Sequence, residues 1–342
     1  MVSCSFFRRC APLAAATIVT ACAQSSPKTI LPTAAGQWPA LTPSAAAHLY
    51  IARFDSLKAI VEYPIQNGIP QANPDRTLEG LGGPIAINLD AAGNLYVLDN
   101  VAFHKQVLKE FAPGASGYAR PIRTIDTPDG NNIGSLAIDS GGYIYVGQNA
   151  RIFVYAPAAH GHAKPVATRR PKGYPSAVAV EPPGDLYELG SSQENQPRRT
   201  FQTQVSVYSG EPSVQLLRHF CGYEESALGI DFGVALDGLG NLFTAHTYFA
   251  GSSYPLGAVH VFPQNDTACP SAPRQKITTN PALHEPVYLA VSAPYLYVYD
   301  LWYGNGGVVF TLKTTGSPQT PLSTLYVDNN QPHNIQDMAL GP

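Results

Sequence analysis

The sequence predicts an all-β protein, a six-bladed β-propeller whose ring is closed by the C-terminal strand. Three observations support this prediction: a short pattern that recurs along the chain, turn residues between its copies, and a C-terminal segment that completes the first copy. The chain contains 30 glycines and 31 prolines, scattered between short apolar segments. Many short strands joined by many turns need this composition, and long helices do not tolerate it.

The recurring pattern is a small turn followed by a strand with a central aromatic residue. It is clearest in "DAAGNLYVLDN" at residues 90–100. The aromatic residues recur at intervals of roughly 40 to 55 residues, and periods of this length with several strands per unit are typical of propeller blades. The six aromatic positions are Tyr50, Tyr96, Tyr145, Tyr187, Phe243 and Tyr297.

The second unit shows the four strands that one blade requires. Each predicted strand is bounded by Gly, Pro, Asn or Asp, the residues that favour turns. The four segments are "PIAINLD" at 84–90, "NLYVLDN" at 94–100, "KQVLKEFAP" at 105–113 and "PIRTI" at 121–125.

The first unit begins at "AHLYIARF", residues 47–54, with no inner strand before it. The missing strand is predicted at the other end of the chain, where "NIQDMALGP" at 334–342 matches the inner-strand pattern of the other units. Pairing of these two segments would close the ring and remove the exposed sheet edges that invite aggregation. The propeller is therefore expected to span residues 48–342.

The N-terminal segment is predicted to be a targeting signal. Residues 1–21 combine Arg8 and Arg9 with an apolar run too short to span a bilayer, which needs about 20 residues. "VTAC" at 19–22 resembles the bacterial lipoprotein box, which implies lipidation of Cys22 and a flexible tether over residues 22–47. The alternative is an ordinary secretory signal cleaved near "ACA". Either location is outside the cytoplasm, and lipidation would anchor the chain to the outer membrane or cell surface.

The charge and the cysteine content limit the classes of partner and the cellular compartment that we expect. With 21 Lys and Arg against 24 Asp and Glu, the net charge of −3 gives no electrostatic reason to expect nucleic acid as a partner. A membrane would be contacted through the lipid anchor only. Outside the signal, the folded part retains Cys221 and Cys269. An exported compartment favours a disulfide between them, and free buried thiols are the alternative.

Two segments carry a resemblance to known proteins. "IAINLDAAGNLYVLD" at 85–99 and "LAIDSGGYIYVGQNARIFVYAP" at 136–157 resemble NHL-repeat and related six-bladed propellers, a group that includes streptogramin lyases and SMP-30/gluconolactonase-like hydrolases. The resemblance covers nearly all of residues 48–342 and implies the fold. It implies activity only weakly, because one scaffold carries binding modules and unrelated enzymes. The calcium-binding positions of the lactonases have no match in this chain.

Comparison of equivalent inner-strand positions within the chain singles out three residues. Alanine occupies the position two before the turn aspartate, or its equivalent, in every unit except the second, which has Asn88. Two positions earlier, small residues give way to Tyr288 and Asp337. Asn88 and Asp337 are candidate metal ligands at the channel, with calcium or magnesium as the candidate ion. Alternatively, Asn88 bonds a neighbouring backbone group and these positions are locally repacked.

Loops at one face of a propeller of this kind gather around the central channel, and binding concentrates on such loops. Here we expect a binding face that includes His104, His246, Tyr248, Tyr288, Trp302 and Tyr303. His284, Glu285 and His333 are candidate catalytic residues, because an imidazole and a carboxylate can act as general acid and base. Solvated loop histidines are the alternative.

Two functions follow from these residues. The first is a lipid-anchored binding or interaction module for a protein, glycan or small ligand. The second is a metal-assisted lyase or lactone hydrolase at the channel mouth; streptogramin lyases, which the fold resembles, use a histidine and magnesium there. Quinone-dependent oxidoreduction is a third option without a specific motif.

The aspartates that precede the repeated turns, Asp90, Asp139 and Asp237, are predicted to form those turns.

Overall fold

The computed structural model describes the propeller and not the N-terminal segment. The chain divides into two units, Met1–Ala35 and Gly36–Pro342, and all described residues belong to the second. The described residues contain strands and turns but no helix, and among them no helix could cross a membrane. They are 47–128, 134–148, 150–171, 174–181, 184–194, 200–210, 215–221, 230–248, 255–301, 307–327 and 335–342.

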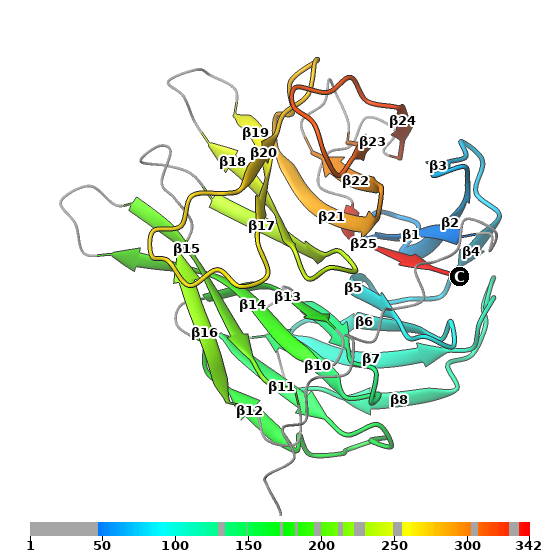
Figure 1. Cartoon of the computed structure of the whole chain (residues 1–342). Helices are drawn as coiled ribbons and strands as arrows, with labels where there is room; N and C mark the ends of the chain where they lie inside the picture. The colour runs from blue at the N-terminus through cyan, green and yellow to red at the C-terminus, as the bar shows by residue number, and fades with distance from the viewer. Residues whose placement is uncertain are drawn as a thin grey trace, which may run out of the picture. The chain divides into compact units, whose positions relative to one another are not determined.

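The strands form six antiparallel sheets, here called blades 1 to 6 (Figure 1). Blade 1 contains β25 (Ile335–Gly341), β1 (Ala47–Arg53), β2 (Ala59–Gln66) and β3 (Ile69–Pro70), with β4 (Arg76–Leu78) also paired to β2. Blade 2 contains β5 (Pro84–Leu89), β6 (Leu95–Ala102), β7 (Lys105–Phe111) and β8 (Arg123–Asp126). Blade 3 contains β9 (Ser135–Ile138), β10 (Ile144–Gln148), β11 (Arg151–Tyr155) and β12 (Ala167–Arg169).

The remaining three blades have the same strand order. Blade 4 contains β13 (Tyr174–Glu181), β14 (Asp185–Glu194), β15 (Thr200–Tyr208) and β16 (Leu216–Cys221). Blade 5 contains β17 (Ile230–Leu236), β18 (Leu242–Tyr248), β19 (Leu256–Phe262) and β20 (Gln275–Ile277). Blade 6 contains β21 (Pro286–Ser292), β22 (Tyr295–Asp300), β23 (Val308–Lys313) and β24 (Ser323–Tyr326).

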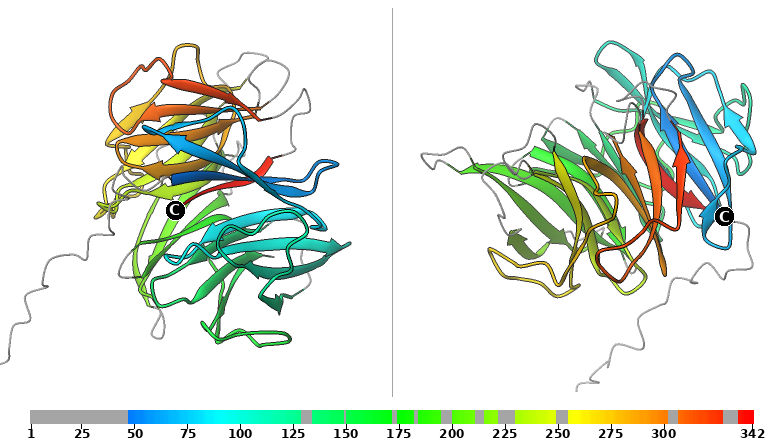
Figure 2. Two further views of the ribbon diagram at one scale, coloured as in Figure 1. Left: turned by 90° about the vertical axis from the view of Figure 1, so that its right-hand side faces the viewer. Right: turned by 90° about the horizontal axis from the view of Figure 1, so that it is seen from above.

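The C-terminal strand closes the ring, as the sequence predicts. β25 pairs antiparallel with β1, and Figure 2 shows the red β25 beside the blue β1. The pair Tyr50 and Ala339 in blade 1 corresponds to Tyr145 and Ala137 in blade 3. The first and last described strands therefore meet within one blade, and the predicted six-bladed fold is confirmed.

The repeat defines the register within each blade. The central aromatic residue lies in the second strand and faces the predicted inner-strand position in all six blades. The pairs are Tyr50–Ala339, Tyr96–Asn88, Tyr145–Ala137, Tyr187–Ala179, Phe243–Ala235 and Tyr297–Ala290. Asn88 is thus a true exception at an equivalent position, not a shift in alignment.

Hydrophobic side chains fill the space between neighbouring blades. Six buried clusters lie one at each blade interface, including the interface between blades 6 and 1. At the interface of blades 2 and 3, for example, Leu98 and Leu108 lie in one cluster with Ile144 and Val146, all at most 1% exposed. Each such side chain contributes about 1.5–3 kcal/mol by leaving water. This packing on both faces explains why the second strands are almost continuously apolar.

In blades 2 and 5 an aspartate builds the turn between the first and second strands. Asp90 Oδ1 accepts hydrogen bonds from the backbone N–H groups of Ala92 and Asn94, both at 2.9 Å. Asp237 repeats this arrangement with Leu239 and Asn241 at the same distances. These aspartates are therefore turn-forming residues, as the sequence predicts.

A disulfide joins blades 4 and 5. Cys221 at the end of β16 is bonded to Cys269, which lies between β19 and β20. Backbone hydrogen bonds support the link, because Ser271 N–H donates to Cys221 C=O at 2.7 Å. The predicted pairing is confirmed, and the bridge links the two blades covalently.

Candidate functional site

A cavity of about 530 Å³ runs along the centre of the propeller and is lined by the first strand of every blade. Its wall consists mainly of small and apolar residues. It reaches the turns at the ends of these strands, since Asp237, Gly238 and Leu239 also line it. Its polar lining includes Asn88, Ser135, Glu181, Tyr288, Gln336 and Asp337.

Asp337 is the most perturbed carboxyl in this channel. The backbone N–H groups of Ile87 and Met338 donate to its two carboxylate oxygens, each at 2.8 Å. Burial raises the pKa of Asp337 to about 7, although the two N–H groups oppose the shift. By area the side chain is only half-buried, because its open side faces the channel. A carboxyl that changes its charge near neutral pH, within a cavity, is a candidate functional group.

Tyr288 and Asn88 share the channel with Asp337. Burial raises the pKa of Tyr288, and the charge of Asp337 raises it further. Its ring stacks on Tyr299 at 6.0 Å between centroids. Asn88 Nδ2 donates to Leu136 C=O at 3.1 Å, the backbone contact that the sequence leaves as its alternative role. Asn88, Tyr288 and Asp337, which depart from the small residues at equivalent positions of the other blades, therefore line one cavity.

The described channel residues do not by themselves provide a calcium or magnesium site. Calcium takes about six to eight oxygen ligands, and magnesium needs about six. Asp337 supplies one carboxylate whose oxygens already accept N–H bonds, and Glu181 is bonded to Tyr187 and Gln264. The metal assignment to Asn88 and Asp337 stays a prediction, and no step below depends on it.

Two of the three predicted acid and base residues, His284 and Glu285, lie in the loop that leads into β21. The N–H groups of His284 and Glu285 donate to the carboxylate of Asp300 at 2.8 and 2.9 Å, which fixes the backbone of both residues. Asp300 is fully buried. His333, Trp302, Tyr303 and Cys22 lie outside the described residues. A catalytic role for His284, Glu285 and His333 stays a prediction.

The remaining predicted face residues occupy different environments. His104 lies at the β6–β7 turn, with its ring 3.9 Å from that of Phe103, which is 83% exposed. The sequence places His246 and Tyr248 in a loop, but the structure places both in β18. His246 is only 4% exposed, because it lies inside β18, two residues before that strand ends.

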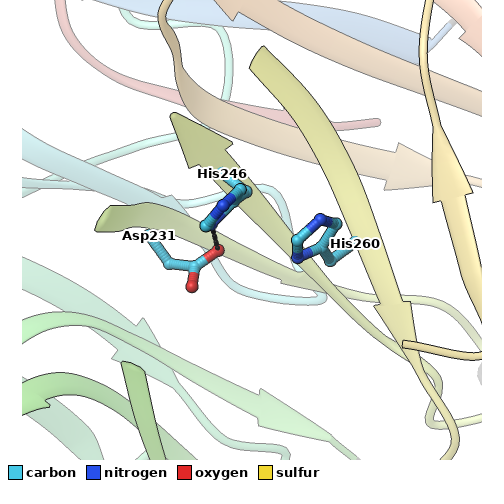
Figure 3. Close-up of side chains that lie close together, drawn as sticks. All are labelled: Asp231, His246 and His260. Carbon is cyan, nitrogen blue, oxygen red and sulfur yellow. Dashed lines mark ion pairs between the residues drawn. The ribbon is translucent and has the colours of Figure 1, made fainter. Parts of the chain in front are cut away.

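His246 belongs to a buried cluster that contains Asp231 and His260. Asp231, His246 and His260 come from β17, β18 and β19, and they are 6%, 4% and 2% exposed. Figure 3 shows the carboxylate and both rings facing one another. Asp231 Oδ1 lies 3.3 Å from His246 Nδ1, and the two imidazole rings stack at 4.3 Å. Within the described ranges, this is the one group of three His, Cys, Asp or Glu residues with metal-site spacing.

Two threonines hold the carboxylate of this cluster. Thr244 Oγ1 donates to Asp231 Oδ1 at 2.9 Å, and Thr203 Oγ1, from blade 4, donates to Oδ2. Burial acts to raise the pKa of Asp231, but contacts with His246, His260 and Thr203 outweigh it and lower the pKa. Asp231 is therefore an ionised carboxylate inside a blade interface.

Sequence reasoning missed His260 and the role of Thr203. A signal was present, because "GAVHVF" at 257–262 places one ionisable residue inside an apolar strand. His260 lies in the third strand of its blade, whereas only the first strands were compared position by position. Thr203 comes from a different blade, so no local pattern connects it with Asp231.

The structure is similar to solved propellers, whereas no known family and no curated protein matches the sequence. A protein of unknown function from Bacteroides caccae has a TM-score of 0.56 at 12% identity, over 86% of this chain and 99% of its own. A protein from Lactobacillus plantarum has a TM-score of 0.53 at 12% identity, over 87% and 100%.

The periplasmic gluconolactonase of Pseudomonas aeruginosa also has this architecture. It aligns with a TM-score of 0.53 at 13% identity, over 87% of this chain and 99% of its own. The resemblance to gluconolactonase-like propellers is thus confirmed for the fold. Fold similarity at this identity does not carry an activity, because function depends on the site.

Proposed function

We propose that this chain is an exported, lipid-anchored propeller that binds a ligand at its central channel and loop-rich face without transforming it. The observation that carries the proposal is the cavity of about 530 Å³ between the six first strands. Small-molecule sites are typically concave, mostly apolar and roughly 300–1,000 Å³ in volume, with a few polar groups that orient the ligand. The channel has these properties.

The channel lining favours a neutral or cationic ligand over an anionic one. Its lining residues include Asp337, Glu181 and Asp237 but no Lys, Arg or His in the part of the chain that the structure describes. An anion would meet carboxylates without a counter-charge. A small molecule with an apolar body and hydroxyl or ammonium groups matches this wall, because Asn88 and Tyr288 can add hydrogen bonds.

The location outside the cytoplasm rests on two features. The N-terminal segment resembles a lipoprotein signal that ends at Cys22. Cys221 and Cys269 form a disulfide, and disulfides persist mainly in oxidising compartments. Incorporation of a labelled fatty acid into the wild-type chain, and its loss in Cys22→Ser, would test the lipid anchor.

A cavity-filling variant tests channel binding. Ala179 lines the cavity and is half-buried, so Ala179→Leu would place a larger side chain there. A ligand-observed NMR screen with monosaccharides, sugar lactones and quaternary amines should reveal at least one saturable binder. Ala179→Leu should weaken it at least about tenfold, the effect of losing about 1.4 kcal/mol.

The matched control is Ala91→Leu, at an exposed turn residue outside the cavity. This control should bind like the wild type. Equal affinity of the wild type and Ala179→Leu would place the bound molecule elsewhere and contradict the channel proposal.

Hydrolysis of a lactone is the second candidate function. Two observations support it: the pKa of Asp337 is raised to about 7, and the periplasmic gluconolactonase shares the fold. A general base works best when its pKa is near the working pH. Ionised Asp337 would take a proton from water as the water oxygen attacks the lactone carbonyl, and the ring oxygen would leave with a proton from solvent.

Turnover of gluconolactone separates the two candidates. Under hydrolysis, Asp337→Asn abolishes the enzyme-dependent rate and retains binding, and the wild-type rate rises with pH through about 7. Under binding alone, neither protein exceeds the spontaneous rate of lactone opening.

A further inference from the structure

We propose that Asp231, His246 and His260 bind one divalent first-row metal ion, with Zn²⁺ as the best match. Two imidazoles and one carboxylate are nitrogen and oxygen donors that zinc accepts. None of the three residues lines the central channel cavity. The site is therefore separate from the proposed ligand-binding channel and does not depend on it.

The register of blade 5 brings the three donors together. Asp231 in β17 pairs directly with His246 in β18, and Thr244, two residues before His246, pairs with His260 in β19. Residues two positions apart on a strand share a face, so the three side chains project to the same side of the sheet. Their ligand atoms all lie within 4.8 Å of one another.

A small movement would convert this arrangement into a metal site. Zinc binds nitrogen and oxygen at about 2.0–2.2 Å, which requires donor atoms about 3.3 Å apart in a tetrahedron. Asp231 Oδ1 and His246 Nδ1 already lie 3.3 Å apart. The two rings are stacked with 21° between their planes, and rotation of one ring about its Cβ–Cγ bond would turn a nitrogen toward the shared space.

Burial of the Asp231 carboxylate favours the binding of a cation beside it. Asp231 is only 6% exposed, and a buried carboxylate is normally paired or bound to a metal. The two threonines donate neutral hydrogen bonds, which do not neutralise the carboxylate. His246 Nδ1 faces the carboxylate at 3.3 Å, and Nε2 of the same ring is buried without a hydrogen-bond partner among the described residues. A metal ion would take a ring nitrogen and the carboxylate as ligands and would neutralise Asp231.

The surroundings hold the donors in place. Thr203 and Thr244 orient the carboxylate, and such outer hydrogen bonds typically accompany metal ligands. Thr203 comes from blade 4, while the three donors come from blade 5. The Cys221–Cys269 bridge clamps the same pair of blades, and Cys221 pairs with Gln204, the residue after Thr203.

Three protein ligands leave one position of a tetrahedral ion for water or another small donor. This is the ligand number of zinc sites that keep an exchangeable position. The ion would join three strands of blade 5 and, through Thr203, fix the contact with blade 4.

Metal titration of the purified full chain tests the proposal. After treatment with a chelator and dialysis, Zn²⁺ should bind with a stoichiometry of about one ion per chain and raise the melting temperature. Co²⁺ should give the visible absorption of a four-coordinate site, and Zn²⁺ should displace it. X-ray absorption of the Zn²⁺ form should show two imidazole donors, a readout that needs no variant.

Substitutions then locate the ion. His260→Gln and Asp231→Asn should each weaken Zn²⁺ binding by about 100-fold or more, because each removes one of three ligands. His162→Gln and Asp337→Asn are the matched controls and should bind like the wild type. His162 is an exposed histidine outside the cluster, and Asp337 is the channel carboxyl.

Three results would overturn the proposal. One is a folded wild-type chain that binds neither Zn²⁺ nor Co²⁺. Another is binding that survives in folded His260→Gln and Asp231→Asn but disappears in Asp337→Asn, which would place the ion in the channel. The third is a wild-type X-ray absorption spectrum without two imidazoles, which decides the matter even if a variant does not fold.

Discussion

Blades 2 and 6 use one position of their second strand in a way that blade 5 does not. The position lies three residues after the central aromatic residue and is occupied by Asp99, Asp300 and His246, respectively. All three side chains are buried, at 0%, 0% and 4% exposure. In blade 5 the residue opposite is Asp231, whereas in blades 2 and 6 it is a proline that begins the first strand.

The aspartates of blades 2 and 6 complete the hydrogen bonding at the start of their sheets. Asp99 accepts the N–H groups of Gly82 and Gly83, at 2.8 to 3.0 Å, and pairs with Lys109 at 2.6 Å. Asp300 accepts the N–H groups of the two residues before the proline in blade 6. Proline has no N–H to offer the second strand, so the carboxylate satisfies the two donors that precede it.

The residue at this position stabilises the fold in blades 2 and 6, whereas in blade 5 it belongs to a candidate site. A buried aspartate at this position is part of how two blades are built. In blade 5 the carboxylate belongs to the first strand, and the same position holds an imidazole beside another. Propeller construction does not require that exchange, and this is why the cluster of Asp231, His246 and His260 stands out as a site.

The largest expected effect comes from removing the aspartate where it is structural. Asp99→Ala should destabilise the protein by about 3–5 kcal/mol, because it leaves Lys109 and two buried N–H groups without their partner. Asp300→Ala should cost about 3 kcal/mol, because it removes the acceptor of the His284 and Glu285 N–H groups. Thermal and urea unfolding would measure both. Asp75→Ala, whose side chain is 52% exposed, is the control and should change stability by less than about 0.5 kcal/mol.

Removal of the disulfide tests what holds blade 5 against blade 4. Its cysteines are separated by 48 residues, for which chain entropy gives a stabilisation of about 4 kcal/mol. Cys221→Ser with Cys269→Ser should therefore lower the unfolding midpoint and weaken Zn²⁺ binding, because Thr203 lies beside the bridge. Unchanged metal affinity in the folded double variant would show that the clamp does not support the cluster.

The variant His246→Asp tests whether blade 5 stays stable with the aspartate that blades 2 and 6 have at this position. The new carboxyl would face Asp231, and two buried carboxylates resist simultaneous ionisation. We expect a loss of about 2 kcal/mol at pH 8. The folded pKa of one carboxyl would be raised, so the variant should regain stability as the pH falls toward the unfolded value. A melting-temperature deficit that is independent of pH would contradict this explanation.

An effect of similar size is expected from Asp337 in the channel. Its folded pKa of about 7 lies above the ordinary value of 3.8, so its contribution to stability is fully present below pH 4 and is lost as the pH rises through 7. Asp337→Asn cannot ionise but can accept only one of the two N–H bonds. Relative to the wild type, its stability should rise by about 2 kcal/mol from pH 4 to pH 8, since channel water screens the half-buried carboxyl. A constant difference in melting temperature over that range would refute the raised pKa.

The sequence was sufficient for the fold because the repeat is a local property. Turn residues such as Asp90 and Gly93, followed by an aromatic strand, identify the same two strands in blades 2, 3 and 5, and the aromatic residue marks the second strand in the other blades. The unusual residues of the channel were also predictable, since Asn88 and Asp337 occupy positions where the other blades have small side chains. Strand length was less predictable, and His246 therefore belongs to β18 rather than to a loop.

The site between blades was not predictable in the same way. His260 lies in a third strand, and Thr203 lies in another blade, far from Asp231 in sequence. Nothing in the local patterns of these three segments says that their side chains meet. Only strand register and the packing of blade 4 on blade 5 bring Thr203 to the carboxylate.

By itself, the sequence determined the number of blades and the closure of the ring, and it favoured the cysteine pair that the structure then confirmed. These depend on turn chemistry, on alternation along a strand and on the segment missing from the first unit, all of which are written in order along the chain. The tertiary structure decided which polar side chains are buried together. That outcome depends on sheet twist and on contacts across blade interfaces, where a carboxylate is stabilised or not by residues distant in sequence.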